Sequence, residues 1–250
     1  MDCFRLTYLK STGLEKSDFE ECSSSYGYGK IASPSSPSPG DPIPENFSSE
    51  AVLKQAKMDL RHPDPQVRIL AIRYYLEKSF PSIPLALLQE ILSDQDPEVR
   101  AQALHSLVKF RSPILSPLLK KYLKDNDPRV RIAALRGMFQ YQERIDLGIF
   151  LQFLSDESTL VRRKVATLLG WTQLEGALPI LVELSRDEHS MVRRAALFSL
   201  ATLYPDEGEN LLMEAMTDSD PDVRKWAKTT LEKILAGPLK RRTASVTNRG

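Results

Sequence analysis

Apolar residues recur at helical spacing through most of the chain. One pattern places an apolar residue, a small residue four positions later and a large residue four further on, as in Val99, Ala103 and Leu107. This spacing puts all three on one side of a helix, and the small middle residue lets a neighbouring helix approach closely. The equivalent trios are Val67, Ala71 and Tyr75; Val130, Ala134 and Met138; Val161, Val165 and Leu169; Val192, Ala196 and Leu200; and Val223, Ala227 and Leu231.

A second apolar pattern precedes each trio, as in Leu87, Leu88, Ile91 and Leu92. Its spacing is also helical and predicts a first helix in each unit. The later copies are Leu118, Leu119, Tyr122 and Leu123; Ile149, Phe150, Phe153 and Leu154; Ile180, Leu181 and Leu184; and Leu211, Leu212 and Met216. The chain is therefore predicted to consist of helical hairpins that bury their faces by stacking on one another.

A polar stretch of nearly fixed form joins the two helices of each hairpin. Its clearest copies, 94–100, 125–131 and 218–224, read Asp-x-Asp-Pro-x-Val-Arg; looser copies are 62–68, 156–162 and 187–193. The second aspartate suits the N-cap of the following helix, a contribution of about 1 kcal/mol, and the proline suits its first turn. Asp64, Asp96, Asp127 and Asp220 are the predicted caps, with Ser158 in the fourth copy and His189, the least regular, in the fifth.

The arginines that close these stretches mark the period. They are Arg68, Arg100, Arg131, Arg162, Arg193 and Arg224, so that successive differences are 32, 31, 31, 31 and 31. A fixed period of this size is typical of a solenoid. The predicted fold class is all-α, an α-solenoid of about six helical hairpins.

The repeated stretch resembles the HEAT family, in the short form known as phycobilisome-lyase-like HEAT repeats, over roughly residues 48–236. The resemblance implies a right-handed superhelix and a structural ladder of aspartates and arginines between adjacent repeats. The ladder residues are Asp94, Arg100, Asp125, Arg131, Asp156, Arg162, Asp187, Arg193, Asp218 and Arg224. The first copy departs from the pattern with His62, which suits a terminal repeat that has no preceding neighbour.

Three segments are predicted. Residues 1–47 form an N-terminal extension, with a docking peptide or a disordered start over 1–20 and then a Ser/Pro-rich linker; 48–236 form the solenoid; and 237–250 form a disordered basic tail. The extension has four basic and seven acidic residues (net −3), and the tail has four basic residues and no acid, within a net charge of +1 for the chain. Near-neutral repeats argue against nucleic-acid binding.

Composition points to a protein of the reducing cytoplasm. No apolar run reaches the ~20 residues that a membrane span needs. The start of the chain does not resemble a signal peptide, and Cys3 and Cys22 form no metal or disulfide framework. We therefore expect a cytoplasmic protein without a membrane span.

No catalytic residue, metal site or cofactor is predicted. The histidines His62, His105 and His189 are followed by proline or serine, so the His-Glu pairs of the HEAT-type deoxyhypusine hydroxylases are absent from the sequence. No phosphate-binding loop or nucleophile elbow occurs. The regularly placed aspartates are accounted for by caps and the ladder.

The second helices carry the predicted binding residues on the side away from the core. They are Arg73, His105, Arg136, Lys164, Trp171, Met191, Phe198 and Trp226. The resemblance implies that this side is concave, and aromatic, Met and Arg side chains are enriched in protein interfaces. The favoured function is a non-enzymatic scaffold or adaptor that binds another protein there. Two alternatives stay open: Trp171 and Phe198 are core or turn residues, or the chain acts like a bilin lyase or a phycobilisome-turnover protein.

Overall fold

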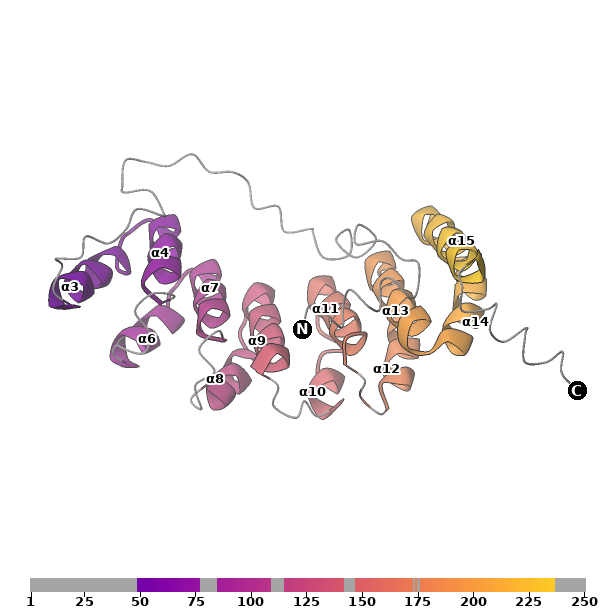
Figure 1. Cartoon of the computed structure of the whole chain (residues 1–250), viewed down its shortest axis with the longest axis horizontal. Helices are drawn as coiled ribbons and strands as arrows, with labels where there is room; N and C mark the ends of the chain where they lie inside the picture. Colours follow the sequence, from indigo (N-terminus) through magenta and orange to yellow (C-terminus); the bar gives the residue numbers. More distant parts are fainter. Residues whose placement is uncertain are drawn as a thin grey trace, which may run out of the picture. The chain divides into compact units, whose positions relative to one another are not determined.

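The computed structural model describes residues 49–76, 85–108, 115–141, 147–172, 174 and 176–236, and every regular element in these ranges is a helix (Figure 1). The N-terminal extension and the basic tail predicted above lie outside the described residues. Packing divides the chain into two compact units, with the division in the repeats after Asp146. We call the described parts of these units the 49–141 unit and the 147–236 unit.

The 49–141 unit contains three helical hairpins. Its helices are α3 (Ser49–Asp59), α4 (Pro65–Ala71), η1 (Ile72–Leu76), α6 (Leu85–Leu92), α7 (Pro97–Val108), α8 (Leu115–Tyr122) and α9 (Pro128–Tyr141). The π-helical turn η1 continues α4 directly. The second helices α4, α7 and α9 pack against one another in chain order, and each first helix packs against the second helix of its own hairpin.

The 147–236 unit repeats this arrangement with three more hairpins. Its helices are α10 (Leu147–Leu151), α11 (Thr159–Leu169), α12 (Ala177–Leu184), α13 (Ser190–Leu203), α14 (Pro205–Ala215) and α15 (Pro221–Ala236). α13 packs against α11 on one side and α15 on the other, so the second helices again form one layer (Figure 1). The prediction of all-α hairpins of the solenoid class is confirmed.

The apolar stripes form the core of each unit. All three members of the trios that begin at Val99, Val130, Val161 and Val192 are buried. Val67 and Leu231, in the first and last trios, are only half-buried, because they have a neighbouring hairpin on one side. Met216 was predicted to be in the stripe of its first helix but is 39% exposed, since no further hairpin packs on α14 in the described residues.

Helix starts follow the predicted caps where the cap is aspartate. The carboxylates of Asp64, Asp96, Asp127 and Asp220 each accept the N–H of the residue two positions on, at 2.8–2.9 Å. Ser158 and His189 do stand at N-cap positions, but neither side chain makes a capping hydrogen bond. The capping role predicted for the Ser158 hydroxyl was therefore wrong, although its position was right.

The first helix α3 carries polar residues because some of them make hydrogen bonds within the first hairpin. The hydroxyl of the buried Tyr75 donates to one oxygen of Asp59 at 2.8 Å, and the side-chain amide of Gln55 donates to the other at 2.8 Å. Burial and this carboxylate raise the pKa of Tyr75 well above its ordinary value. Asp59 thus fixes the first hairpin through hydrogen bonds where later repeats use apolar contacts.

The sequence pattern places Gly208, like Gly170, at the end of a second helix or in a turn between repeats, but the structure places Gly208 elsewhere. Gly208 lies within α14, which already begins at Pro205. A Cβ at this position would overlap the backbone of Ala201 on α13. Glycine therefore lets α14 pack closely on α13. Gly170, by contrast, directly follows α11 as expected.

Candidate functional site: the arginine rungs and the second-helix face

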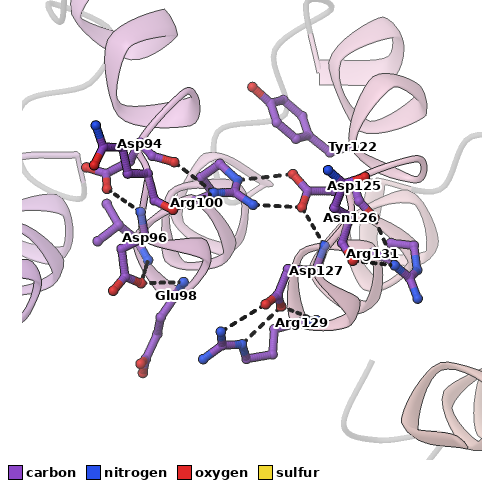
Figure 2. Close-up of polar contacts among 12 residues, drawn as sticks. Asp94, Asp96, Glu98, Arg100, Tyr122, Asp125, Asn126, Asp127, Arg129 and Arg131 are labelled. Carbon is purple, nitrogen blue, oxygen red and sulfur yellow. Dashed lines mark hydrogen bonds and ion pairs between the residues drawn. The ribbon is translucent and has the colours of Figure 1, made fainter. Parts of the chain in front are cut away.

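Arg100 links the polar turn of its own hairpin to that of the next hairpin (Figure 2). Its Nη1 donates to the backbone carbonyls of Asp94 and Gln95, at 2.8 and 3.2 Å. Its Nε and Nη2 donate to the two carboxylate oxygens of Asp125, at 3.0 and 2.7 Å. One guanidinium thus makes a two-point ion pair with the next repeat while its other edge is held by its own turn.

The same two-edged arrangement recurs at three other arginines. In each, Nη1 donates to carbonyls of its own turn, and Nε with Nη2 grips an aspartate of the next hairpin. The pairs are Arg68 with Asp94 (2.7 and 2.8 Å), Arg162 with Asp187 (2.7 and 3.0 Å) and Arg193 with Asp218 (2.8 and 2.6 Å). We call each of these units a rung: an arginine, its own turn and the aspartate of the next repeat.

The aspartate of each rung also shapes its own turn. Asp94, Asp125, Asp187 and Asp218 each accept the backbone N–H of the residue two positions on, at 2.8–2.9 Å. In the first hairpin, Nδ1 of His62 accepts the N–H of Asp64 at 3.1 Å. His62 thus makes the turn hydrogen bond that aspartate makes in later repeats, at a position where no arginine of a preceding repeat needs a carboxylate partner.

The rungs are shielded enough from water for their charges to matter. The side chains of Arg162 and Asp187 are only 7% and 8% exposed. Hydrogen bonding to Asp218 raises the pKa of Arg193 despite burial, and the same bonds lower the pKa of Asp218 below its ordinary range. Burial acts to raise the pKa of Asp187, but the hydrogen bonds from Arg162 and the His189 N–H outweigh it and leave the pKa lowered. The rungs of Arg162 and Arg193 therefore favour the ionised carboxylate.

Two arginines of the series differ. Arg131 is buried and its Nη1 donates to the carbonyls of Asp125 and Asn126. Its expected rung with Asp156 stays a prediction, because these residues belong to different units. Arg224, in the last hairpin, has the carbonyl contacts but donates to no aspartate side chain among the described residues.

In the 49–141 unit, three predicted binding residues lie on the second helices. Arg73, in η1, is exposed and its Nη2 donates to the side-chain oxygen of Gln102 on α7 at 3.3 Å. His105 on α7 is half-buried and Arg136 on α9 is exposed. Leu70, one turn before Arg73, is 47% exposed and adds an apolar position to this surface.

In the 147–236 unit, four predicted residues lie on α11 and α13 or directly after α11. Lys164 lies over the ring of Trp171, with its ammonium 6.0 Å from the ring centroid. Met191 is 36% exposed. Trp171 and Phe198 are half-buried. These side chains combine apolar and basic groups on one layer of helices.

Trp226 has a different setting from the other aromatic residues. It is half-buried and packs against the core cluster formed by Leu197, Leu212, Ala215, Val223 and Ala227. The expectation that Trp226 requires no core contact was therefore wrong. The indole thus adds to the apolar packing of α13, α14 and α15.

The family comparison matches most of the chain. A family model described as HEAT repeats matches residues 52–139, 115–201 and 183–244. The chain belongs to the HEAT-repeat family. The resemblance read from the repeated polar stretch is thereby confirmed, and the rungs are the contacts between successive HEAT repeats.

Several solved structures are similar to this chain at low sequence identity. An engineered protein is 21% identical, with 74% of this chain and 99% of that chain covered and a TM-score of 0.46. The complex of CpcE and CpcF of phycocyanin lyase from Nostoc sp. is 18% identical, with 82% of each chain covered and a TM-score of 0.48. Human deoxyhypusine hydroxylase is 17% identical, with 76% and 86% covered and a TM-score of 0.34. A search of curated proteins finds no match.

Two arginines of the HEAT repeats have roles that the sequence did not predict. Arg68 was named in the repeat but not in the ladder, although it forms a full rung with Asp94. Arg163 follows Arg162 in the sequence, where a second charge beside the ladder and a solvated side chain are both open interpretations; it is only 8% exposed, and its Nη1 lies 3.9 Å from the sulfur of Met191. Continuing the period back by one repeat identifies Arg68, but no sequence signal distinguishes Arg163 from the exposed Lys225.

Within the described ranges, no group of three or more His, Cys, Asp or Glu side chains is placed to hold a metal ion. Nor does any described helix have the length and apolar character to cross a bilayer.

Proposed function

We propose that this HEAT-repeat protein is a non-enzymatic scaffold or adaptor that binds another protein along its second helices. The main support is a mixed set of side chains on and next to α11 and α13: Met191 is 36% exposed next to Arg163, and Lys164 lies over the ring of Trp171. Stacked repeats commonly present extended binding surfaces made from equivalent positions. The face is expected to be concave, as in HEAT solenoids, and no cofactor is required.

Two properties of the surface favour a protein partner. The half-buried Trp171 and Phe198 offer flat apolar area while remaining partly accessible, and Lys164 supplies charge next to Trp171. Aromatic anchors with a polar surround are typical of protein interfaces. A surface that binds nucleic acid usually carries a continuous basic stripe. The described second-helix positions instead include basic, neutral and apolar residues.

The test compares two exposed methionines in the full chain. Met191 lies on the second helix α13, whereas Met213, 46% exposed, lies on the first helix α14. Met191→Glu should reduce the partner recovered from native extract, measured by quantitative mass spectrometry, at least tenfold, or about 1.4 kcal/mol of binding free energy. Met213→Glu should leave recovery unchanged. Equal loss in both variants, or in neither, contradicts a second-helix binding face.

The lyase alternative has a separate outcome. An enzyme of the bilin lyase type must bind a linear tetrapyrrole, and the visible spectrum of the pigment changes when a protein fixes its conformation. The scaffold proposal predicts that mixing the purified chain with a linear tetrapyrrole leaves the pigment spectrum unchanged. A saturable spectral change would favour the lyase alternative.

A further inference from the structure

Arg224 is an open rung at the end of the repeats. Its Nη1 donates to the carbonyls of Asp218 and Ser219, at 2.6 and 3.0 Å, so its guanidinium is anchored to its own turn as in the other rungs. The side chain is exposed, and no carboxylate of the described residues reaches its Nε or Nη2. Continuing the spacing of 25 residues that separates Arg193 from Asp218 leads to position 249, which is an arginine.

The closed rungs define what this open edge accepts. In the rungs of Arg68, Arg100, Arg162 and Arg193, both oxygens of one carboxylate meet Nε and Nη2 at 2.6–3.0 Å. The carbonyl contacts on the opposite edge are the same in Arg224. The guanidinium of Arg224 is already oriented by its carbonyl contacts. Binding a carboxylate there therefore costs less conformational entropy than binding one to a freely rotating surface arginine.

The surroundings of Arg224 are charged rather than apolar. Four positions after each earlier arginine lies a buried apolar residue, such as Leu197; the last repeat has the exposed Lys228 instead. Lys225 is also exposed, whereas the equivalent Arg194 is half-buried. The exposed acids Asp222 and Glu232 share α15, but α15 as a whole has four basic and two acidic residues, and the four basic residues of 237–250 follow it in the sequence.

We propose that Arg224 binds a carboxylate from an acidic segment of a partner protein, with Lys225 and Lys228 favouring the acidic residues around it. The carboxylate takes the place that Asp218 occupies on Arg193. A second copy stacked head to tail is a poor occupant, because its first repeat carries His62 where this carboxylate is needed. Lysine at position 228 likewise disfavours the apolar stacking that a further hairpin requires.

This site is separate from the second-helix face proposed above, and its test is independent. The probe is a fluorescein-labelled peptide of four Asp-Ser pairs, with Asn-Ser pairs as the uncharged control, titrated into the full chain at about 0.1 M salt, where exposed charges are partly screened. Fluorescence anisotropy measures the Kd. The variants are Arg224→Gln, Arg224→Lys and Lys225→Gln, each checked for unchanged helical content by circular dichroism.

The expected result depends on the two-point contact and not on charge alone. Arg224→Gln should weaken peptide binding at least tenfold and Arg224→Lys at least fivefold, while Lys225→Gln, the same charge change as Arg224→Gln, should weaken it less than threefold. Met191→Glu should bind the peptide like the parent, so failure of the second-helix proposal would not affect this one.

Three results would overturn the proposal. Equal losses for Arg224→Gln and Lys225→Gln would mean nonspecific attraction. Failure of the parent chain to bind the Asp-Ser peptide would mean that no such site is available, as when acidic residues of the chain's own 1–47 segment occupy it. A concentration-dependent dimer in sedimentation that Arg224→Gln abolishes would identify a second copy as the occupant.

Discussion

At the residue scale, Arg193 and Arg224 form a natural pair for measuring what a rung contributes. Both anchor Nη1 on two carbonyls of their own turn, but only Arg193 grips an aspartate of a following hairpin, with side chains 11% and 10% exposed. Arg193→Ala should lower the free energy of unfolding by about 2–4 kcal/mol, because it leaves Asp218 shielded and uncompensated.

Arg224→Ala is the matched control for Arg193→Ala. It should cost about 1 kcal/mol or less, since it removes only the carbonyl contacts of an exposed side chain. Urea unfolding followed by circular dichroism gives both values. Equal costs would mean that the inter-repeat ion pair adds nothing beyond the anchoring of the turn.

The sequence was informative at this scale where one residue has one local task. Aspartate caps such as Asp96 were predicted correctly, because the capping hydrogen bond spans two residues. Side chains whose setting depends on a neighbouring repeat were not. Arg163 and Lys225 occupy equivalent positions, yet one is buried and the other exposed, because only the first has a later hairpin beside it.

At the scale of the helix, Gly208 shows how one residue sets the spacing of two elements. Within a helix, alanine is more favourable than glycine by about 1 kcal/mol. At position 208, however, the alanine Cβ would overlap the backbone of Ala201, which cannot move aside as a flexible side chain can. We expect Gly208→Ala to destabilise the chain by about 1–3 kcal/mol through the displacement of α14 from α13.

The comparison for Gly208→Ala is Asn210→Ala on the same helix. Asn210 is exposed, so its replacement meets no neighbouring helix and should change stability by no more than about 0.5 kcal/mol. Both variants are measured by urea unfolding. A Gly208→Ala chain as stable as the parent would show that α14 moves at little cost and that the close packing is not required.

Helices were the most predictable level of this structure. Asp220 was predicted to cap the last helix, and α15 runs over Pro221–Ala236, directly after it. A period of 3.6 residues and a capped start determine such an element locally. The position of α14 was less predictable because Gly208 resembles a helix end in sequence, while its reason, contact with Ala201, lies in the preceding helix.

At the scale of the whole molecule, the period predicted six hairpins but not their division into two units after Asp146. The interval from Arg131 to Arg162 is 31 residues, the same as the next two intervals, so nothing in the repeat marks a boundary there. Compactness depends on how well neighbouring hairpins pack. The spacing of the arginines carries no information about packing between neighbouring hairpins.

Two rung aspartates, Asp187 and Asp218, and the capping Asp127 make the stability of the chain depend on pH. Hydrogen bonds from Arg193 lower the pKa of Asp218 below its ordinary 3.8, and the pKa values of Asp187 and Asp127 are lowered as well. A carboxyl group with a lowered pKa binds fewer protons in the folded chain than in the unfolded chain. Its stabilising contribution is therefore fully present above its unfolded pKa and is lost as the pH falls through the folded pKa.

We expect the urea midpoint of the parent chain to be nearly constant from pH 7 to about 5 and to fall steadily below about pH 4. Arg193→Ala should have a lower midpoint at pH 7 but a shallower fall in acid. In this variant Asp218 has already lost its ion pair with Arg193, so protonation of Asp218 removes less stability. The two curves should converge as the pH approaches about 2. Parallel curves would show that Asp218 does not carry the acid sensitivity and that the capping aspartates outside the rungs do.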